Sequence, residues 1–161
     1  MILVDTSVWI DYFNGRPTAE ANLLDDLLGY EWILVGDLIL AEVLQGFRNE
    51  EDFREALRVL ATLEFREMLG RSVAIASARN YRALRAKGVT VRKTIDVLIG
   101  TFCLLNGHEL LHADRDFDPM TEHLGLKVLK PETIDASRRA SRARSGRATS
   151  RGRRQPGSPR R

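Results

Sequence analysis

The sequence has one cysteine among 161 residues, and no apolar run approaches the roughly 20 residues that a membrane-spanning helix needs. Cys103 therefore has no partner for an internal disulfide, and its apolar surroundings (DVLIGTFCLL) predict a small buried side chain. No basic segment precedes the first apolar run. We expect an unexported, cytoplasmic protein that makes no use of a membrane.

Several motifs that carry chemistry are also missing. The first apolar run leads into DTSVW, without the glycines of G-x-G-x-x-G or the G-K-[ST] of a phosphate loop, which argues against a nucleotide-binding enzyme. Neither Ser7 nor Cys103 has an evident histidine base, so a nucleophilic serine or cysteine is unsupported. His108, His112 and His123 are scattered, lack the spacing of a zinc site, and are more simply explained as structural or exposed residues.

The formal net charge of +3 averages two unlike regions. Residues 137–161 hold ten arginines and no acid, which leaves 15 basic (25 − 10) and 22 acidic residues in 1–136, a charge of −7. The tail also lacks aromatic residues and large aliphatic ones, so we expect it to be disordered. We predict a folded domain at 1–136 and an arginine-rich tail at 137–161 that associates with RNA non-specifically or serves no purpose.

Buried strands alternate with amphipathic helices along the body of the chain. Apolar runs predict strands at 2–4, 32–36, 109–112 and 126–129, with a further short strand near 69–71. Periodic apolar residues predict helices between them, including a long charged helix at 50–69 and a wholly apolar, central one from Thr94. This alternation predicts an α/β fold with a mostly parallel sheet of four or five strands and helices on both faces.

Four acids occupy corresponding positions on separate elements. Asp5 and Asp114 each end a predicted strand, while Glu42 and Asp96 lie near the starts of apolar helices. All four should meet at the carboxyl edge of the sheet, where open α/β sheets bind ligands. Thr6 and Ser7 are predicted to cap the helix that follows the first strand. Taken alone, Asp5 is equally compatible with simple capping of the same helix.

An acidic cleft of this kind predicts a metal. Carboxylates that converge in a cleft repel one another and lose hydration, and a hard divalent cation relieves that repulsion. Mg²⁺ prefers oxygen ligands and commonly works with phosphate substrates. Asp116 and Asp118 are close enough in sequence to Asp114 to add to the same cluster.

Four segments resemble, in order, the motifs of PIN-domain ribonucleases, above all the VapC toxins of bacterial toxin–antitoxin pairs. They are VDTSVWIDYF, AEVLQGF, TIDVLIGTFCLLNG and LLHADRDFDPM, and the resemblance covers residues 1–130. It implies a three-layer α/β/α fold in which Asp5, Glu42, Asp96 and Asp114 bind Mg²⁺ or Mn²⁺, as does Asp116 in some members. Gly100 stands where alanine is more common, and the arginine tail extends past the usual end.

The resemblance further implies metal-assisted hydrolysis of RNA phosphodiester bonds, a cognate antitoxin that fills the cleft, and a homodimer. Cations near an acidic cleft would be needed to attract RNA, and Arg92, Lys93 and Arg115 are candidates beside the acids. Two other classes of function stay open: a non-catalytic RNA-binding module with vestigial acids, and an acid-cluster phosphatase acting on small phosphate esters.

Overall fold

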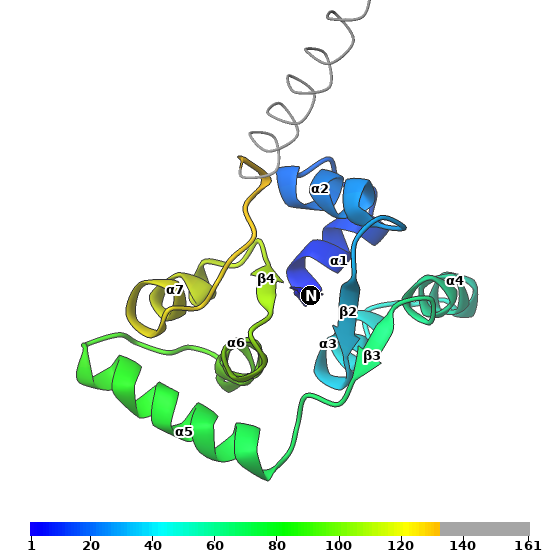
Figure 1. Ribbon diagram of the computed structural model, residues 1–161. Helices are drawn as coiled ribbons and strands as arrows, with labels where there is room; N and C mark the ends of the chain where they lie inside the picture. The colour runs from blue at the N-terminus through cyan, green and yellow to red at the C-terminus, as the bar shows by residue number, and fades with distance from the viewer. Residues whose placement is uncertain (133–161) are drawn as a thin grey trace, which may run out of the picture. The chain divides into compact units, whose positions relative to one another are not determined.

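Four short parallel strands form the centre of the computed structural model, which describes residues 1–132 (Figure 1). Their spatial order is β3-β2-β1-β4, and every residue of β1 and β2 is buried, as the uninterrupted apolar runs predicted. The strands are β1 (Ile2–Val4), β2 (Ile33–Gly36), β3 (Glu64–Arg66) and β4 (Glu109–Leu111).

Helices cover both faces of this sheet, which confirms the predicted α/β architecture. Figure 1 shows α1 and α2 on one side of the sheet and α5 and α6 on the other. The helices are α1 (Thr6–Phe13), α2 (Ala19–Leu27), α3 (Asp37–Leu44), α4 (Glu50–Leu60), α5 (Arg71–Ala86), α6 (Thr94–Asn106) and α7 (Asp118–Leu124), with a 3₁₀ turn, η1 (Arg115–Phe117), before α7. Among the described residues, no helix is both long and apolar enough to span a bilayer.

Helix α6 is the central helix, as its composition predicted. Its buried residues include Val97, Ile99, Phe102 and Cys103. A Cβ atom at Gly100 would lie 2.6 Å from the Met120 sulfur on α7, so the glycine permits a close approach between the two helices. Burial raises the pKa of the Cys103 thiol to about 12, which fits a small hydrophobic side chain rather than a nucleophile.

Two of the predicted strands differ in the structure. The predicted helix at 50–69 ends at Leu60, and β3 follows at Glu64–Arg66 rather than near 69–71. Phe65 pairs with Val35, so the hydrogen bonds available at the sheet edge override the helical pattern there. The predicted strand at 126–129 is reduced to a single bridge between Leu110 and Val128.

The chain divides into two units, Met1–Leu129 and Lys130–Arg161. The first contains the sheet and all the helices named above. The predicted tail at 137–161 and the end of the predicted domain at 136 lie outside the described residues.

Candidate functional site: a carboxylate cluster

The sheet topology places one cleft at the carboxyl ends of β1 and β4. From β1 the chain adds β2 and β3 on one side and then returns to place β4 on the other, so the direction of winding reverses between β1 and β4. Ligands in open α/β sheets bind at such a reversal. The Asp5 N–H donates a 2.9 Å hydrogen bond to the Leu111 carbonyl, which ties the two strand ends together.

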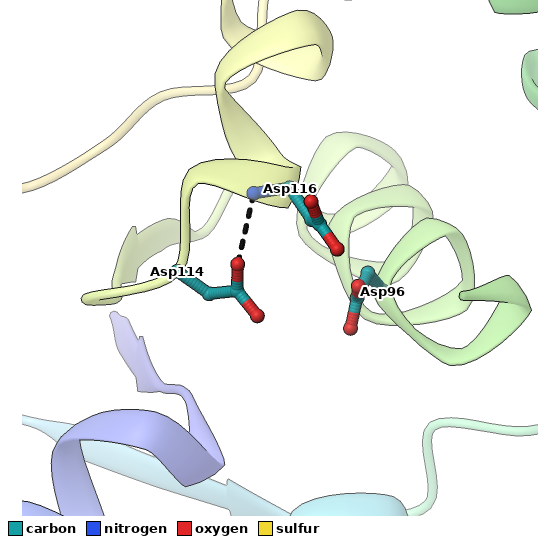
Figure 2. A group of neighbouring side chains, drawn as sticks. All are labelled: Asp96, Asp114 and Asp116. Atoms are coloured by element: carbon teal, nitrogen blue, oxygen red, sulfur yellow. Dashed lines mark hydrogen bonds between the residues drawn. The ribbon is translucent and has the colours of Figure 1, made fainter. Parts of the chain in front are cut away.

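Three aspartates form a compact cluster beside this point (Figure 2). Asp96 comes from the first turn of α6, while Asp114 and Asp116 come from the segment that follows β4. One carboxylate oxygen from each lies within 4.8 Å of the others. The Asp116 N–H donates a 3.0 Å hydrogen bond to Asp114 Oδ1, so the η1 turn itself holds these two residues together. We refer to Asp96, Asp114 and Asp116 as the acid cluster.

Asp96 is the least solvated member of the acid cluster. It is 7% exposed, and its Oδ2 atom has no hydrogen-bond partner among the described residues. Desolvation raises the pKa of Asp96 to about 6, and the negative charges of Asp114, Asp5 and Asp116 add to the rise while Lys93 opposes it. A buried carboxylate oxygen without a hydrogen-bond donor, beside other carboxylates, is favourable for binding a cation.

Two basic side chains already compensate part of this negative charge. Lys93 Nζ lies 2.8 Å from Asp114 Oδ2 and 3.9 Å from Asp96 Oδ2, and Arg92 Nε lies 3.6 Å from Asp116 Oδ1. The hydrogen bond from Lys93 lowers the pKa of Asp114, and the same bond raises the pKa of Lys93. Sequence reasoning identified Lys93 as a candidate for RNA contact but missed its position between two carboxylates, which depends on the packing of α6 against η1.

Asp5 is buried, and hydrogen bonds hold its carboxylate in place. The Ser7 N–H and the Ser7 hydroxyl donate hydrogen bonds to Asp5 Oδ2 at 2.9 Å and 2.6 Å, and Ser7 Oγ accepts one from the Ala113 N–H at 3.1 Å. The prediction that Thr6 and Ser7 cap α1 is wrong, because Asp5 itself is the N-cap. Its negative charge also raises the pKa of Asp96. Asp5 therefore both caps α1 and contributes to the negative charge of the cleft.

Glu42 is hydrogen-bonded to Thr6, the residue that follows Asp5. The Thr6 hydroxyl donates a 2.7 Å hydrogen bond to Glu42 Oε2, which links α3 to the first residue of α1. Within the described chain, the compact group of carboxylates consists of the acid cluster alone. Asp5 is coupled to it by charge, and Glu42 is joined to the neighbour of Asp5. Asp118, the other candidate, begins α7 and is exposed.

The raised pKa of Asp96 predicts an unusual pH dependence of stability. The folded state binds the Asp96 proton more tightly than the unfolded state, whose pKa is near 3.8, so stability in EDTA should fall as pH rises from about 4 to about 6. The whole change in the free energy of unfolding should be on the order of 3 kcal/mol. Urea unfolding across this range should show that the free energy of unfolding of Asp96→Asn rises relative to that of wild type as pH rises. Parallel curves for the two proteins would contradict the raised pKa.

The donor set fits a hard divalent cation. It consists of carboxylate oxygens, one of them buried without a donor, and the neighbouring Asp5 adds a further negative charge. Oxygen-only donors favour Mg²⁺, Mn²⁺ or Ca²⁺ over zinc, which prefers nitrogen and sulfur. The chemistry available to such a site is Lewis-acid activation of water and of phosphate.

Residues 2–122 match the family model of the PIN domain. The chain is a PIN-domain protein. A VapC ribonuclease of Mycobacterium bovis and the ribonuclease VapC11 of Mycobacterium tuberculosis are each 32% identical to this PIN-domain chain over 130 residues, which cover 80% of the chain and 97% of either relative.

Solved structures show the same fold. A chain from the VapBC2 complex of Rickettsia felis bound to promoter DNA has a TM-score of 0.65 and 20% identity, and the match covers 80% of this PIN-domain protein and 98% of that chain. A chain from VapBC-1 of nontypeable Haemophilus influenzae has a TM-score of 0.63 and 19% identity, with coverage of 82% and 99%. The three-layer PIN fold predicted from the motifs is confirmed.

Proposed function

We propose that this PIN-domain protein is a metal-dependent endoribonuclease that hydrolyses RNA phosphodiester bonds. The observation that supports it most is the acid cluster, in which the buried Asp96 presents a carboxylate oxygen without a donor to two further aspartates. The VapC ribonucleases at 32% identity support the same reaction class. Mg²⁺ and Mn²⁺ are the ions that suit both the oxygen ligands and a phosphate substrate.

Each acid has a part in this proposal. Asp96, Asp114 and Asp116 would hold the ion together with Asp5, and Glu42 would either ligate it or orient the attacking water. The ion, when bound, would activate water for in-line attack and neutralise charge on the phosphorus oxygens. Ser7 and Thr6 act as positioning residues, because their hydroxyls fix the carboxylates of Asp5 and Glu42.

The similarity to VapC proteins also supports a proposal about the binding partners and the cellular location of this protein. We propose that the protein is the toxin of a toxin–antitoxin pair, that a segment of a cognate antitoxin fills the acidic cleft, and that the protein acts as a homodimer in the cytoplasm. The relatives named VapC and the fold shared with chains of VapBC complexes support this assignment. An antitoxin segment that supplies a cation to the acid cluster would compete with the metal for the same carboxylates.

The proposed reaction predicts strict metal dependence. The full chain should cleave single-stranded RNA in Mg²⁺ or Mn²⁺, lose this activity in EDTA, and leave a chromogenic phosphate monoester essentially unhydrolysed. Gel analysis of the RNA and absorbance of the ester would measure both. Binding without cleavage in any metal would favour a non-catalytic module, and preferential hydrolysis of the ester would favour a phosphatase.

The toxin assignment predicts a cellular result. Expression of the chain alone should arrest growth, and co-expression with a small protein encoded beside it should relieve the arrest. Normal growth in the presence of well-folded, partner-free protein would contradict the toxin assignment while leaving the chemistry untouched.

A further inference from the structure

A long segment of the described chain that contains basic residues and no acid ends just before the acid cluster. Residues 68–95 hold seven basic residues and no acid, and five of the seven lie on α5 or at its C-cap. The stretch ends at Arg92 and Lys93, directly before α6 and Asp96. Helix α5 packs against α6 and crosses it in Figure 1, where α6 is seen end-on, so this charge is carried on the helix that packs against the one bearing Asp96.

A groove runs between α5 and α6. It has a volume of about 540 Å³, within the range of ligand-binding clefts, and its lining includes the small side chains of Ala74 and Ala78. We call it the α5–α6 groove; the residues that matter for its chemistry are Ala78, Tyr81, Arg82, Arg85, Thr94 and Leu98.

The α5–α6 groove is continuous with the acidic cleft. Tyr81 and Arg85 also line a second depression, formed with the loop after α5. Residues 89–91 line both that depression and a third, whose walls include Asp96 and Asp116. An extended chain lying in the α5–α6 groove therefore has an open path over residues 89–91 to the acid cluster.

The charge along this path suits a polyanion. The side chains of Arg82 and Arg85 are exposed and make no salt bridge or hydrogen bond within the described part of the chain, so their guanidinium donors are available. Arg92 and Lys93, in contrast, are already paired with the acid cluster. Within the three depressions, the only acids are Asp96 and Asp116, at the far end where a metal would compensate them.

We propose that the α5–α6 groove binds the backbone of single-stranded RNA and delivers it to the acid cluster. This inference rests on the proposed ribonuclease function. Arg82 and Arg85 contact successive phosphates, and Tyr81, which lines both depressions, stacks against a base. The substrate is a single strand rather than a duplex, because Tyr81 can stack only against an unpaired, exposed base.

A second copy of the chain is the main rival occupant. A two-fold interface at the α5–α6 groove would bring Arg82 and Arg85 against the same residues of the other copy, and like charges at close range oppose such an interface. Charge complementarity therefore favours RNA over a homodimer contact here.

The test measures binding of a short, mixed-sequence single-stranded RNA to the full chain in EDTA, over a series of salt concentrations. The Arg82→Ala/Arg85→Ala variant should weaken binding on the order of tenfold at 0.1 M salt and reduce the slope of log K against log salt by about 1.4, or about 0.7 for each lost phosphate contact. The control is Arg79→Ala/Lys87→Ala, which removes the same charge from the same region but lies outside the groove lining. Tyr81→Ala should lower affinity about tenfold, whereas Tyr81→Phe should retain it.

Equal slopes for the groove variant and its control would overturn the proposal, as would loss of dimerisation by the groove variant in sedimentation without a change in RNA binding. Because binding is measured without metal, it is separate from cleavage. A wild-type protein that cleaves RNA while the groove variants bind normally would refute the groove and leave the ribonuclease assignment standing. If RNA binding depended on the groove but the protein cleaved no RNA in Mg²⁺ or Mn²⁺, the groove would stand and the ribonuclease assignment would be refuted.

Discussion

Replacing Asp96 by asparagine should lower RNA cleavage at least about 100-fold, because it removes a ligand charge from the point where phosphate charge must be neutralised. Asparagine keeps the size of the side chain and its place in the first turn of α6. The loss should therefore reflect metal binding rather than misfolding. Initial rates of RNA cleavage at saturating Mg²⁺, compared with rates at low Mg²⁺, would measure it.

The stability of the same variant provides an independent readout. In EDTA above pH 6, Asp96→Asn should be more stable than wild type, because the buried negative charge and its repulsion by Asp114, Asp5 and Asp116 are gone. Added Mg²⁺ should raise the melting temperature of wild type more than that of the variant, since a ligand stabilises only the state that binds it. A residue that served only to stabilise its helix would show the opposite sign in EDTA.

Asp118→Asn is the matched control for Asp96→Asn. It makes the same chemical change in the segment that carries Asp114 and Asp116, but Asp118 is exposed and lies outside the acid cluster. Its cleavage rate and its response to Mg²⁺ should stay close to those of wild type. A fully active Asp96→Asn protein, or equal losses in the two variants, would refute the assigned role of the acid cluster.

The sequence was sufficient to predict the parts of the site that depend on local patterns. Apolar runs identified β1 and β2, and the apolar pair Leu110–Leu111 identified β4. Acids at the ends of strands and the starts of helices identified Asp5, Asp96 and Asp114. Local sequence is sufficient to predict these positions for two reasons. A buried strand appears in the sequence as an apolar run, and the carboxyl ends of parallel strands lie at one edge of the sheet.

The relations between elements were harder to predict. The motifs gave Glu42 a larger part than Asp116, yet the η1 turn places Asp116 in the acid cluster, while Glu42 depends on how α3 packs near Thr6. The sequence also contains the acid-free stretch 68–95, but the meaning of that charge depends on the groove that α5 makes with α6. Such features arise from contacts between distant segments, which periodicity does not encode.

Phe117→Ala should produce the largest loss of stability, about 3–5 kcal/mol, because it empties a fully buried site in the core. Phe117 ends the η1 turn that carries Asp114 and Asp116, and its ring lies against His112, with 4.9 Å between ring centres. The cavity should therefore loosen the acid cluster as well as the core. Urea unfolding in EDTA, followed by melting with and without Mg²⁺, would measure both effects.

Asp96→Asn and Phe117→Ala should thus change the stability of the metal-free protein in opposite directions. Asp96→Asn is expected to stabilise the metal-free protein and weaken its response to Mg²⁺, whereas Phe117→Ala should weaken both. Phe117→Leu should recover part of the stability because it fills most of the cavity, and Phe65→Ala should cost far less because Phe65 is 47% exposed on β3. If Phe117→Ala left the response to Mg²⁺ intact, the ligands would be held by the η1 hydrogen bond alone, without support from the core beneath them.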